Sequence, residues 1–152
     1  MATLFIICDL SGSMVESGKR FIVRNMVRTI DQYFRLQRSQ PEIKLVAWSD
    51  EAIVAKWQPG QEVPDALLAC AGDVSGDSLV AKLGDNPEGY FMMLSDGYWS
   101  PSSRKAIGSW SRSLPNGHFR ILKIGEDADP RLKGPSVFSA EDLLPALKGW
   151  VS

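Results

Sequence analysis

Three oxygen-bearing side chains follow a short apolar run near the start of the chain. The run Leu4–Cys8 is followed directly by Asp9, Ser11 and Ser13 in a D-x-S-x-S segment. Because these residues alternate within a turn of small residues, the loop can direct all three side chains at one point. A carboxylate and two hydroxyls are hard oxygen ligands, which a hard divalent cation such as Mg²⁺ prefers. The segment therefore predicts a metal-binding loop.

A second carboxylate has the same setting later in the chain. The apolar run 90–94 has the pattern of a buried strand, and Ser95-Asp96-Gly97 follows it at once. In an open parallel sheet, ligands bind beyond the carboxyl ends of the strands. Asp9 and Asp96 are therefore expected at the same edge of one sheet, and this coincidence is stronger evidence for a metal than either residue alone.

Local interpretations of the same residues stay open. Ser13 or Ser17 could cap the helix that follows, and Asp96-Gly97 could be only a turn pair. Other metals fit less well. The loop lacks the repeated acids of a calcium-binding EF-hand, and the chain has only one histidine and two separated cysteines for zinc. Magnesium is favoured, with manganese or calcium as substitutes.

The apolar pattern also predicts the elements that position these side chains. Helical spacing extends over residues 19–38, and shorter helical patterns occupy 63–83, 102–113 and 140–151. Strand patterns occupy residues 3–8, 43–48, 52–57, 90–94, 119–124 and 137–138. Strands that alternate with helices predict an α/β three-layer sandwich. Its sheet is expected to be mostly parallel, with one antiparallel edge hairpin from the second and third strands.

Composition limits the class of protein. The chain has 152 residues, 44% of them apolar, so a single domain over residues 1–152 is expected. A net charge of −1 gives no broad field for nucleic acid or an anionic membrane, and neither is an expected partner. No stretch reaches the roughly 20 apolar residues of a membrane span, and no leader pattern opens the chain. With Cys8 and Cys70 interpreted as free thiols, a cytoplasmic protein is predicted.

The order and spacing of these motifs resemble a von Willebrand factor A-type (vWA) domain with a metal-ion-dependent adhesion site. The resemblance rests on the D-x-S-x-S segment, a Gly-rich loop before a mid-chain helix and the later Ser-Asp-Gly, and it covers essentially the whole chain. It implies a vWA/Rossmann-like fold and a bound Mg²⁺. In that site Asp9 is the anchor, Ser11 and Ser13 are direct ligands, and Asp96 is a ligand or holds a metal-bound water.

The resemblance leaves one ligand position open. The family supplies a threonine from its second motif, whereas this chain has Ser75-Gly76-Asp77-Ser78 at the aligned segment. Asp77 is the first choice for this position, with Ser75 or Ser78 as alternatives after a small shift. A third carboxylate would hold the metal strongly and reduce its attraction for a partner's acidic group. A serine would preserve that attraction.

The function implied by the resemblance is a non-enzymatic, intracellular interaction module or adaptor whose metal binds an aspartate or glutamate of a protein partner. Similar small bacterial proteins act beside AAA-type ATPases or in stress-response systems. Tyr98 and Trp99 follow Asp96 and could form an aromatic hot spot at the rim of the metal site. Trp99 could equally fold into the core.

Two alternative functions remain. Strand-end aspartates and a metal also suit a Mg²⁺-dependent phosphate hydrolase, but Ser11 stands where such an enzyme would place a second, general-acid aspartate. A metal-independent adaptor could instead use the polar side of the long helix to bind an acidic partner or RNA. That side carries four arginines, Arg24, Arg28, Arg35 and Arg38.

Overall fold

Six strands form one sheet, in the order β3-β2-β1-β4-β5-β6, in the computed structural model, which describes residues 2–151. Their bounds are β1 Thr3–Asp9, β2 Glu42–Trp48, β3 Ala52–Val54, β4 Tyr90–Ser95, β5 Phe119–Lys123 and β6 Val137–Ser139. All neighbouring strands are parallel except β2 and β3, which form an antiparallel edge hairpin. The predicted sheet is confirmed, although β3 is shorter than its apolar pattern indicated.

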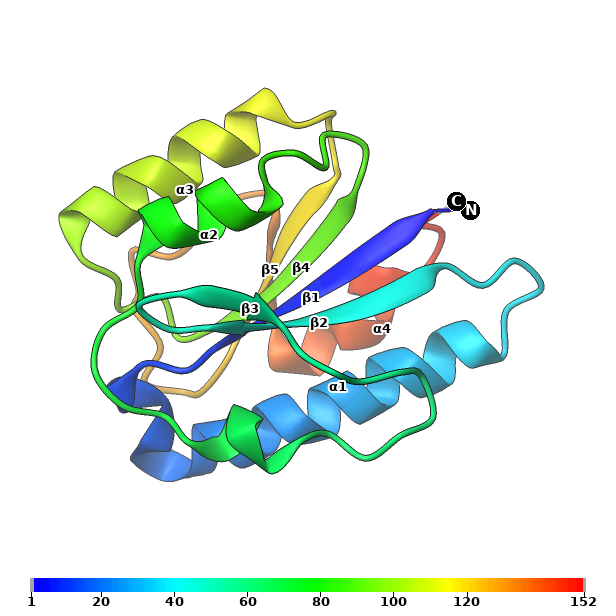
Figure 1. Cartoon of the computed structure of the whole chain (residues 1–152), viewed down its shortest axis with the longest axis horizontal. Helices are drawn as coiled ribbons and strands as arrows, with labels where there is room; N and C mark the ends of the chain where they lie inside the picture. The colour runs from blue at the N-terminus through cyan, green and yellow to red at the C-terminus, as the bar shows by residue number, and fades with distance from the viewer. Residues whose placement is uncertain (1, 152) are drawn as a thin grey trace.

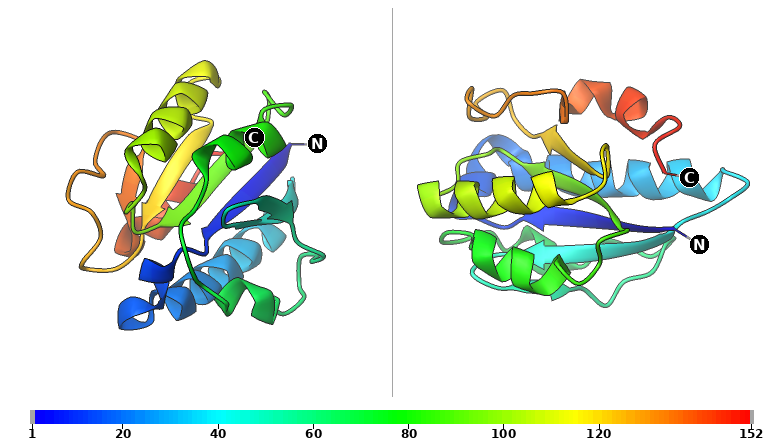
Figure 2. Two further views of the ribbon diagram at one scale, coloured as in Figure 1. Left: turned by 60° about the vertical axis from the view of Figure 1, so that its left-hand side comes forward. Right: turned by 90° about the horizontal axis from the view of Figure 1, so that it is seen from above.

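Helices cover both faces of the sheet (Figure 1). Helices α1 (Lys19–Arg35) and α4 (Leu143–Leu147) pack on one face, and α2 (Gly76–Leu83) and α3 (Pro101–Ser113) pack on the other. The described residues also form three short 3₁₀ helices, η1 (Gly12–Gly18), η2 (Asp65–Leu68) and η3 (Ala140–Asp142). Figure 2 shows the same layers from two further directions. The fold is the predicted three-layer α/β sandwich.

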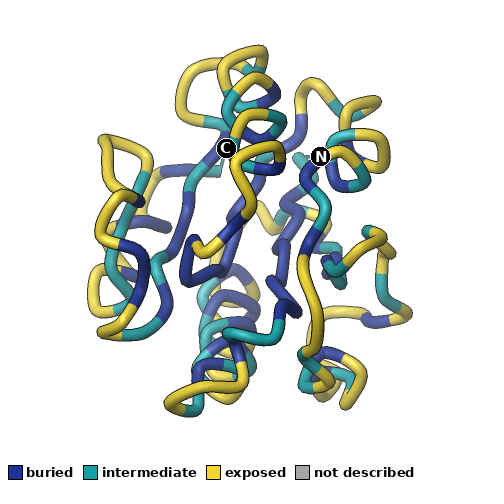
Figure 3. The backbone as a smooth tube through the Cα atoms, turned by 90° about the vertical axis from the view of Figure 1, so that its left-hand side faces the viewer, coloured by how far each residue is buried: buried dark blue, intermediate teal, exposed yellow. Residues whose placement is uncertain are grey.

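The central strand β1 is apolar throughout because it is covered on both faces. Successive side chains of a strand point to opposite faces. Leu4, Ile6 and Cys8 therefore join the core beneath α1 and α4, whereas Phe5 and Ile7 join the core beneath α2 and α3. Figure 3 shows this buried interior running along the strands, with the exposed positions in the surrounding loops and outer helix faces.

Helix α1 begins without a serine cap. Its N-cap is Gly18, in the left-handed conformation at φ 69°, and no side chain caps the helix. Ser17 also has a positive φ, of 55°. The interpretation of Ser13 or Ser17 as a helix cap is therefore wrong, and the Ser13 hydroxyl is not used by α1.

The last predicted helix is shorter than its pattern. Residues 140–151 divide into η3 and α4, and the chain becomes extended at Lys148, just before Gly149 takes a φ of 67°. Within residues 2–151, none of the helices has the length and apolar character needed to cross a membrane.

The strand order has a switch point between β1 and β4. From β1 the chain moves outward to β2 and β3, and it then returns to the other side of β1 to form β4, β5 and β6. In open α/β sheets, the crevice beyond the carboxyl ends of the strands at such a switch point is the usual ligand site. Asp9 ends β1, and Asp96 follows β4, so both predicted carboxylates lie at this crevice.

Candidate metal centre

Asp9, the acidic residue of the D-x-S-x-S loop, is buried, with 1% of its surface exposed. Its Oδ1 accepts a hydrogen bond from the backbone N–H of Ser11 at 2.8 Å, and its Oδ2 accepts one from the Ser95 hydroxyl at 2.6 Å. Burial raises the pKa of Asp9, and the bonds from Ser95 and Ser11 oppose this shift. Because both donors are neutral, they leave a buried negative charge that a cation would stabilise.

The hydroxyls of Ser11 and Ser13 are hydrogen-bonded to each other, and their separation also matches that of two neighbouring metal ligands. The Oγ atoms of Ser11 and Ser13 lie 3.1 Å apart, and Ser11 is itself buried. Ligands at about 2.1 Å in adjacent octahedral positions around Mg²⁺ are about 3.0 Å from each other. The donor set therefore fits a small, hard dication, with two neutral hydroxyls beside a buried carboxylate.

Asp96 lies across the switch point from Asp9, close enough for its charge to act on Asp9. It is fully buried, and its negative charge contributes to the raised pKa of Asp9. Asp96 Oδ1 accepts from the Tyr98 N–H at 3.3 Å, in a tight turn through Gly97 at φ 80°. A Cβ on Gly97 would meet Leu132 Cδ2 at 2.7 Å, so only glycine fits there. The turn interpretation of Asp96-Gly97 is confirmed, and the role of Asp96 at a metal stays a prediction.

Lys19 forms a buried ion pair with Asp96, a role that the sequence did not indicate. It is the first residue of α1, and its side chain is completely buried. Its Nζ donates to Asp96 Oδ2 at 2.9 Å and to Asp127 Oδ2 at 3.0 Å. Burial alone would lower the pKa of Lys19, but the two carboxylates outweigh it and raise the pKa. A lysine at the start of an amphipathic helix looks like a surface residue in sequence, so no signal indicated this role.

Ser95 connects the two motifs and was not singled out as a functional residue. Its buried hydroxyl donates to Asp9 Oδ2 and accepts from the Gly97 N–H at 3.0 Å and the Trp99 Nε1–H at 2.9 Å. One side chain thus orients the Asp9 carboxylate and holds the turn that carries Asp96. Its place directly before Asp96 was the available signal.

The two aromatic residues after Gly97 differ in burial. Trp99 is buried, and its ring packs edge-on against Trp48 with centroids 5.9 Å apart. Tyr98 is 46% exposed, and its hydroxyl donates to the backbone carbonyl of Asp127 at 2.6 Å. Of the two alternatives for Trp99, the core position is confirmed, so Tyr98 alone of this pair lies at the rim of the site.

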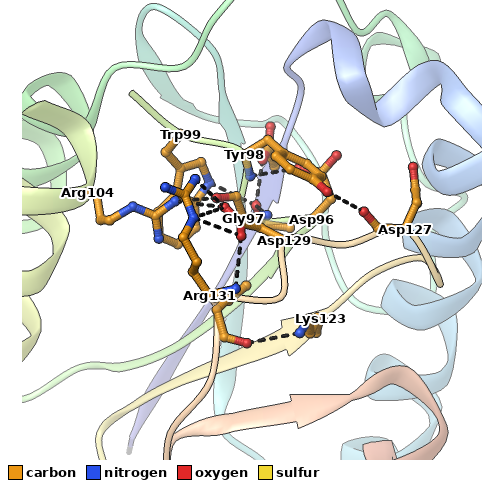
Figure 4. A network of polar contacts seen from close by, with 12 residues as sticks. Asp96, Gly97, Tyr98, Trp99, Arg104, Lys123, Asp127, Asp129 and Arg131 are labelled. Carbon is orange, nitrogen blue, oxygen red and sulfur yellow. Dashed lines mark hydrogen bonds and ion pairs between the residues drawn. The ribbon is translucent and has the colours of Figure 1, made fainter. Parts of the chain in front are cut away.

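The loop after β5 is held against this edge by a third buried aspartate, Asp129 (Figure 4). The Asp129 N–H donates to the Asp96 carbonyl at 2.8 Å. Its carboxylate accepts from Arg131 Nη2 at 2.8 Å and from Arg104 Nη2 at 3.1 Å. The hydrogen bonds from Arg131 hold the pKa of Asp129 well below its usual range. This group is a structural clamp that fixes the backbone of Asp96.

Among residues 2–151, Asp77 does not form a cluster of carboxylates with Asp9 and Asp96. It is an exposed residue in the first turn of α2, and Ser75 caps that helix by accepting from the Ser78 N–H at 3.1 Å. Among residues 2–151, no three His, Cys, Asp or Glu side chains gather into a group that could hold a metal. The three-carboxylate arrangement considered for Asp9, Asp77 and Asp96 is therefore not what the structure assembles.

A slightly earlier part of the same loop does reach the site. The Gly12 N–H donates to the Gly72 carbonyl at 2.8 Å, and the Ala71 N–H donates to the Leu10 carbonyl at 2.9 Å. The loop before α2 is thus hydrogen-bonded to the D-x-S-x-S loop at residues 71–72. Asp73, which is exposed, is the next residue of this loop.

The arginine row on α1 is partly neutralised by acidic neighbours. Arg28 forms an ion pair with Glu62, and Arg35 lies 3.4 Å from Asp31 through Nε and Oδ1. Arg24 instead packs over the ring of Phe21, 5.2 Å from its centroid. These contacts leave the row with less free charge than its sequence indicated.

The chain resembles known proteins in structure and not in sequence. No sequence-family model matches the chain, and no curated protein matches it. A von Willebrand factor type A protein from Catenulispora acidiphila superposes with a TM-score of 0.59 and 18% identity, over 95% of this chain and 40% of that one. Manganese-loaded TRAP protein from Plasmodium vivax gives a TM-score of 0.65 and 14% identity, over 99% and 73% respectively.

A third match is proximal thread matrix protein 1 from the mussel byssus, solved with a zinc-occupied MIDAS motif. It superposes with a TM-score of 0.58 and 10% identity, over 97% of this chain and 46% of that one. The chain thus spans less than half of the Catenulispora and mussel proteins. These likenesses show that the chain has the vWA fold, which confirms the predicted resemblance at the level of the fold.

Proposed function

We propose that this chain is a non-enzymatic protein-interaction module whose metal centre binds an acidic residue of a protein partner. The observation that carries the proposal is the pair of Ser11 and Ser13 hydroxyls, 3.1 Å apart, beside the buried carboxylate of Asp9. A bound dication, Mg²⁺ for preference, would supply an electrophilic centre for an outside carboxylate. Manganese and calcium would be its substitutes.

Each residue has a distinct proposed role. Ser11 and Ser13 are the direct ligands, because their hydroxyls are neutral and correctly spaced. Asp9 is the anchor, since it holds the Ser11 backbone through its Oδ1 and supplies negative charge. Asp96 supplies the second charge, from the other side of the switch point. For the second-motif position we keep a serine hydroxyl, Ser75 or Ser78, because Asp77 does not cluster with Asp9 and Asp96.

Two solved relatives of the fold support a divalent metal at this position. One was determined with manganese, and the other has zinc in its MIDAS motif. Both observations belong to those proteins, and at 14% and 10% identity they share the fold with this chain. The donor set found here is consistent with a metal of that kind.

Exposed apolar residues beside the centre suit a protein partner. Val15 in η1 is 41% exposed, and Tyr98 in the Asp96 turn is 46% exposed. An aromatic ring at such a rim is a typical hot-spot residue. The proposed partner therefore presents an aspartate or glutamate to the metal and an apolar side chain next to it.

The proposed setting is a cytoplasmic adaptor in a bacterial stress-response or AAA-ATPase-associated system. The free thiols support the compartment, since Cys8 is buried and Cys70 is half-buried and neither forms a disulfide. Burial raises the pKa of Cys8 to about 12, so this thiol is unreactive.

A Mn²⁺ titration of matched variants tests the metal centre. We expect wild-type protein to bind one Mn²⁺, as followed by calorimetry or by the loss of the free-ion EPR signal. Asp9→Asn and the double variant S11A/S13A should lose this binding. Asp77→Asn is the matched control, because it removes an exposed carboxylate that the sequence equally suggested. Equal binding by wild type and Asp9→Asn would overturn the proposal, and equal losses in Asp9→Asn and Asp77→Asn would move the site.

The alternative functions have less support. Ser11 uses its backbone to hold Asp9 and its hydroxyl to contact Ser13, so no acid is available there for the hydrolase mechanism. The arginine row of α1 has ion pairs at Arg28 and Arg35. A phosphatase assay with Mg²⁺ remains a direct check, and turnover that Asp9→Asn abolishes would replace the interaction module with an enzyme.

A further inference from the structure

A permanent positive charge is built into the proposed metal centre. The Lys19 side chain has no exposed surface, and its Nζ lies 2.9 Å from Asp96 Oδ2, which is itself completely buried. The other partner of the ammonium, Asp127, is 45% exposed and lies 3.0 Å away. Lys19 therefore acts mainly on Asp96, one of the two carboxylates that the proposed metal depends on.

The packing around Lys19 keeps the ammonium in place. Gly125, at φ 90°, approaches the lysine stem so closely that a Cβ there would meet Lys19 Cδ at 2.7 Å. The same loop is tied down by the Tyr98 hydroxyl, which donates to the Asp127 carbonyl at 2.6 Å. The ammonium cannot move to solvent unless this loop opens, so its charge is a fixed part of the site.

The consequence follows from counting charges. Asp9 and Asp96 together would neutralise a dication, but Lys19 already neutralises Asp96. Among the fully buried groups alone, a dication beside Asp9 would therefore leave one positive charge in excess, because the remaining carboxylate, Asp127, is 45% exposed and its charge is screened by solvent. An outside carboxylate would remove that excess.

We propose that Lys19 weakens the binding of a dication to the free protein and strengthens the binding of a carboxylate to the loaded site. The metal and an acidic partner would then bind cooperatively, each raising the affinity of the other by the same factor. The inference rests on the function proposed above, and it assigns a regulatory role to a residue outside the D-x-S-x-S segment.

Lys19→Met tests the inference, because methionine keeps the length of the apolar stem and removes the charge. We expect Mn²⁺ to bind this variant roughly tenfold more tightly than wild type. Lys123→Met is the matched control, since Lys123 lies at the same sheet edge but its Nζ donates to the Leu132 carbonyl at 3.0 Å. Its affinity should stay within about twofold of wild type.

Acetate serves as the carboxylate probe in the same experiment. At constant ionic strength, acetate should tighten Mn²⁺ binding to wild type more than to Lys19→Met. Unchanged or weaker Mn²⁺ binding by Lys19→Met would overturn the inference alone. If neither wild type nor Lys19→Met binds Mn²⁺, the proposed function and the inference both fail.

A second pair of variants covers the case in which Lys19→Met does not fold. Asp127→Asn removes the second partner of Lys19 and directs its charge entirely at Asp96, so Mn²⁺ binding should weaken. Glu126→Gln is the control, because this exposed neighbour loses the same charge and lies beside Asp127 in the chain. Equal affinities of Asp127→Asn and Glu126→Gln would overturn the inference, as would tighter binding by Asp127→Asn.

Discussion

Two buried aspartates at the same edge of the sheet differ in the partners that surround them. Asp9 and Asp129 are each only 1% exposed. Asp9 accepts from a serine hydroxyl and a backbone N–H, and burial raises its pKa. Asp129 accepts from Arg131 and Arg104, and the bonds from Arg131 lower its pKa. The two pKa values thus shift in opposite directions, because desolvation dominates at Asp9 and the hydrogen bonds from Arg131 dominate at Asp129.

The difference separates a binding region from a structural one. Around Asp129 the carboxylate is compensated by two arginines of the chain itself, and its backbone holds the Asp96 turn in place. Around Asp9 the donors are neutral and leave negative charge for a cation from outside. Lys19 stands between the two regions, since it compensates Asp96 and leaves Asp9 to the metal.

The largest expected effect separates the two aspartates by metal affinity. Asp9→Asn should weaken Mn²⁺ binding at least ~100-fold, because it removes the anchor charge and leaves Asp96 with its lysine partner. Asp129→Asn should change the affinity by less than about threefold, because its carboxylate is turned toward the arginines. Calorimetric titration of both variants measures the contrast. A similar loss in both would break the distinction between a binding and a structural aspartate.

The next largest effect concerns Ser95, which links Asp9 to the Asp96 turn. Ser95→Ala removes the donor to Asp9 and leaves the Gly97 N–H and the Trp99 Nε1–H without their acceptor. Buried donors without a partner are costly, so we expect a loss of about 2–3 kcal/mol in the free energy of unfolding. Urea denaturation in EDTA measures it. Ser102→Ala, at an exposed position of α3, is the control and should stay within about 0.5 kcal/mol of wild type.

The two aspartates should also give opposite pH dependence, which is a smaller effect. The lowered pKa of Asp129 contributes stability above its unfolded value of about 4, and this is lost as the pH falls through the folded value. The raised pKa of Asp9 favours the folded state below the unfolded value, and this is lost as the pH rises through the folded value.

Denaturation curves across this pH range in EDTA distinguish the two groups. Asp129→Asn should flatten the loss of stability on the acid side, whereas Asp9→Asn should gain stability relative to wild type as the pH rises above about 4. Parallel pH profiles for the two variants would show that partner charge does not separate these residues.

The smallest expected effect is at Tyr98. Tyr98→Phe loses only the hydrogen bond to the Asp127 carbonyl, at a residue that is 46% exposed. The free energy of unfolding should fall by about 0.5–1 kcal/mol, and Mn²⁺ affinity should stay the same. A change in metal affinity would mean that the Asp127 loop and Lys19 respond to Tyr98, which would extend the binding region beyond Asp9.

Much of this arrangement could be predicted from local patterns. Continuous apolar runs indicated buried strands, and the carboxyl ends of parallel strands meet at one edge, so Asp9 and Asp96 were expected together. The second-motif residue could not be placed in the same way. The position of a loop residue depends on backbone hydrogen bonds such as that from Gly12 to Gly72. The apolar periodicity of the sequence does not predict such bonds.

The sequence by itself determined the three-layer fold, the D-x-S-x-S loop and its meeting with Asp96, because all three follow from apolar periodicity and strand direction. Only the tertiary structure decided that Trp99 is buried, that Asp77 does not cluster with Asp9 and Asp96 and that Lys19 pairs with Asp96. The physical reason is that these outcomes depend on contacts between distant segments. Lys19 and Asp96 are 77 positions apart in the chain, and their ion pair forms only when α1 and the β4 turn are packed on the same sheet edge.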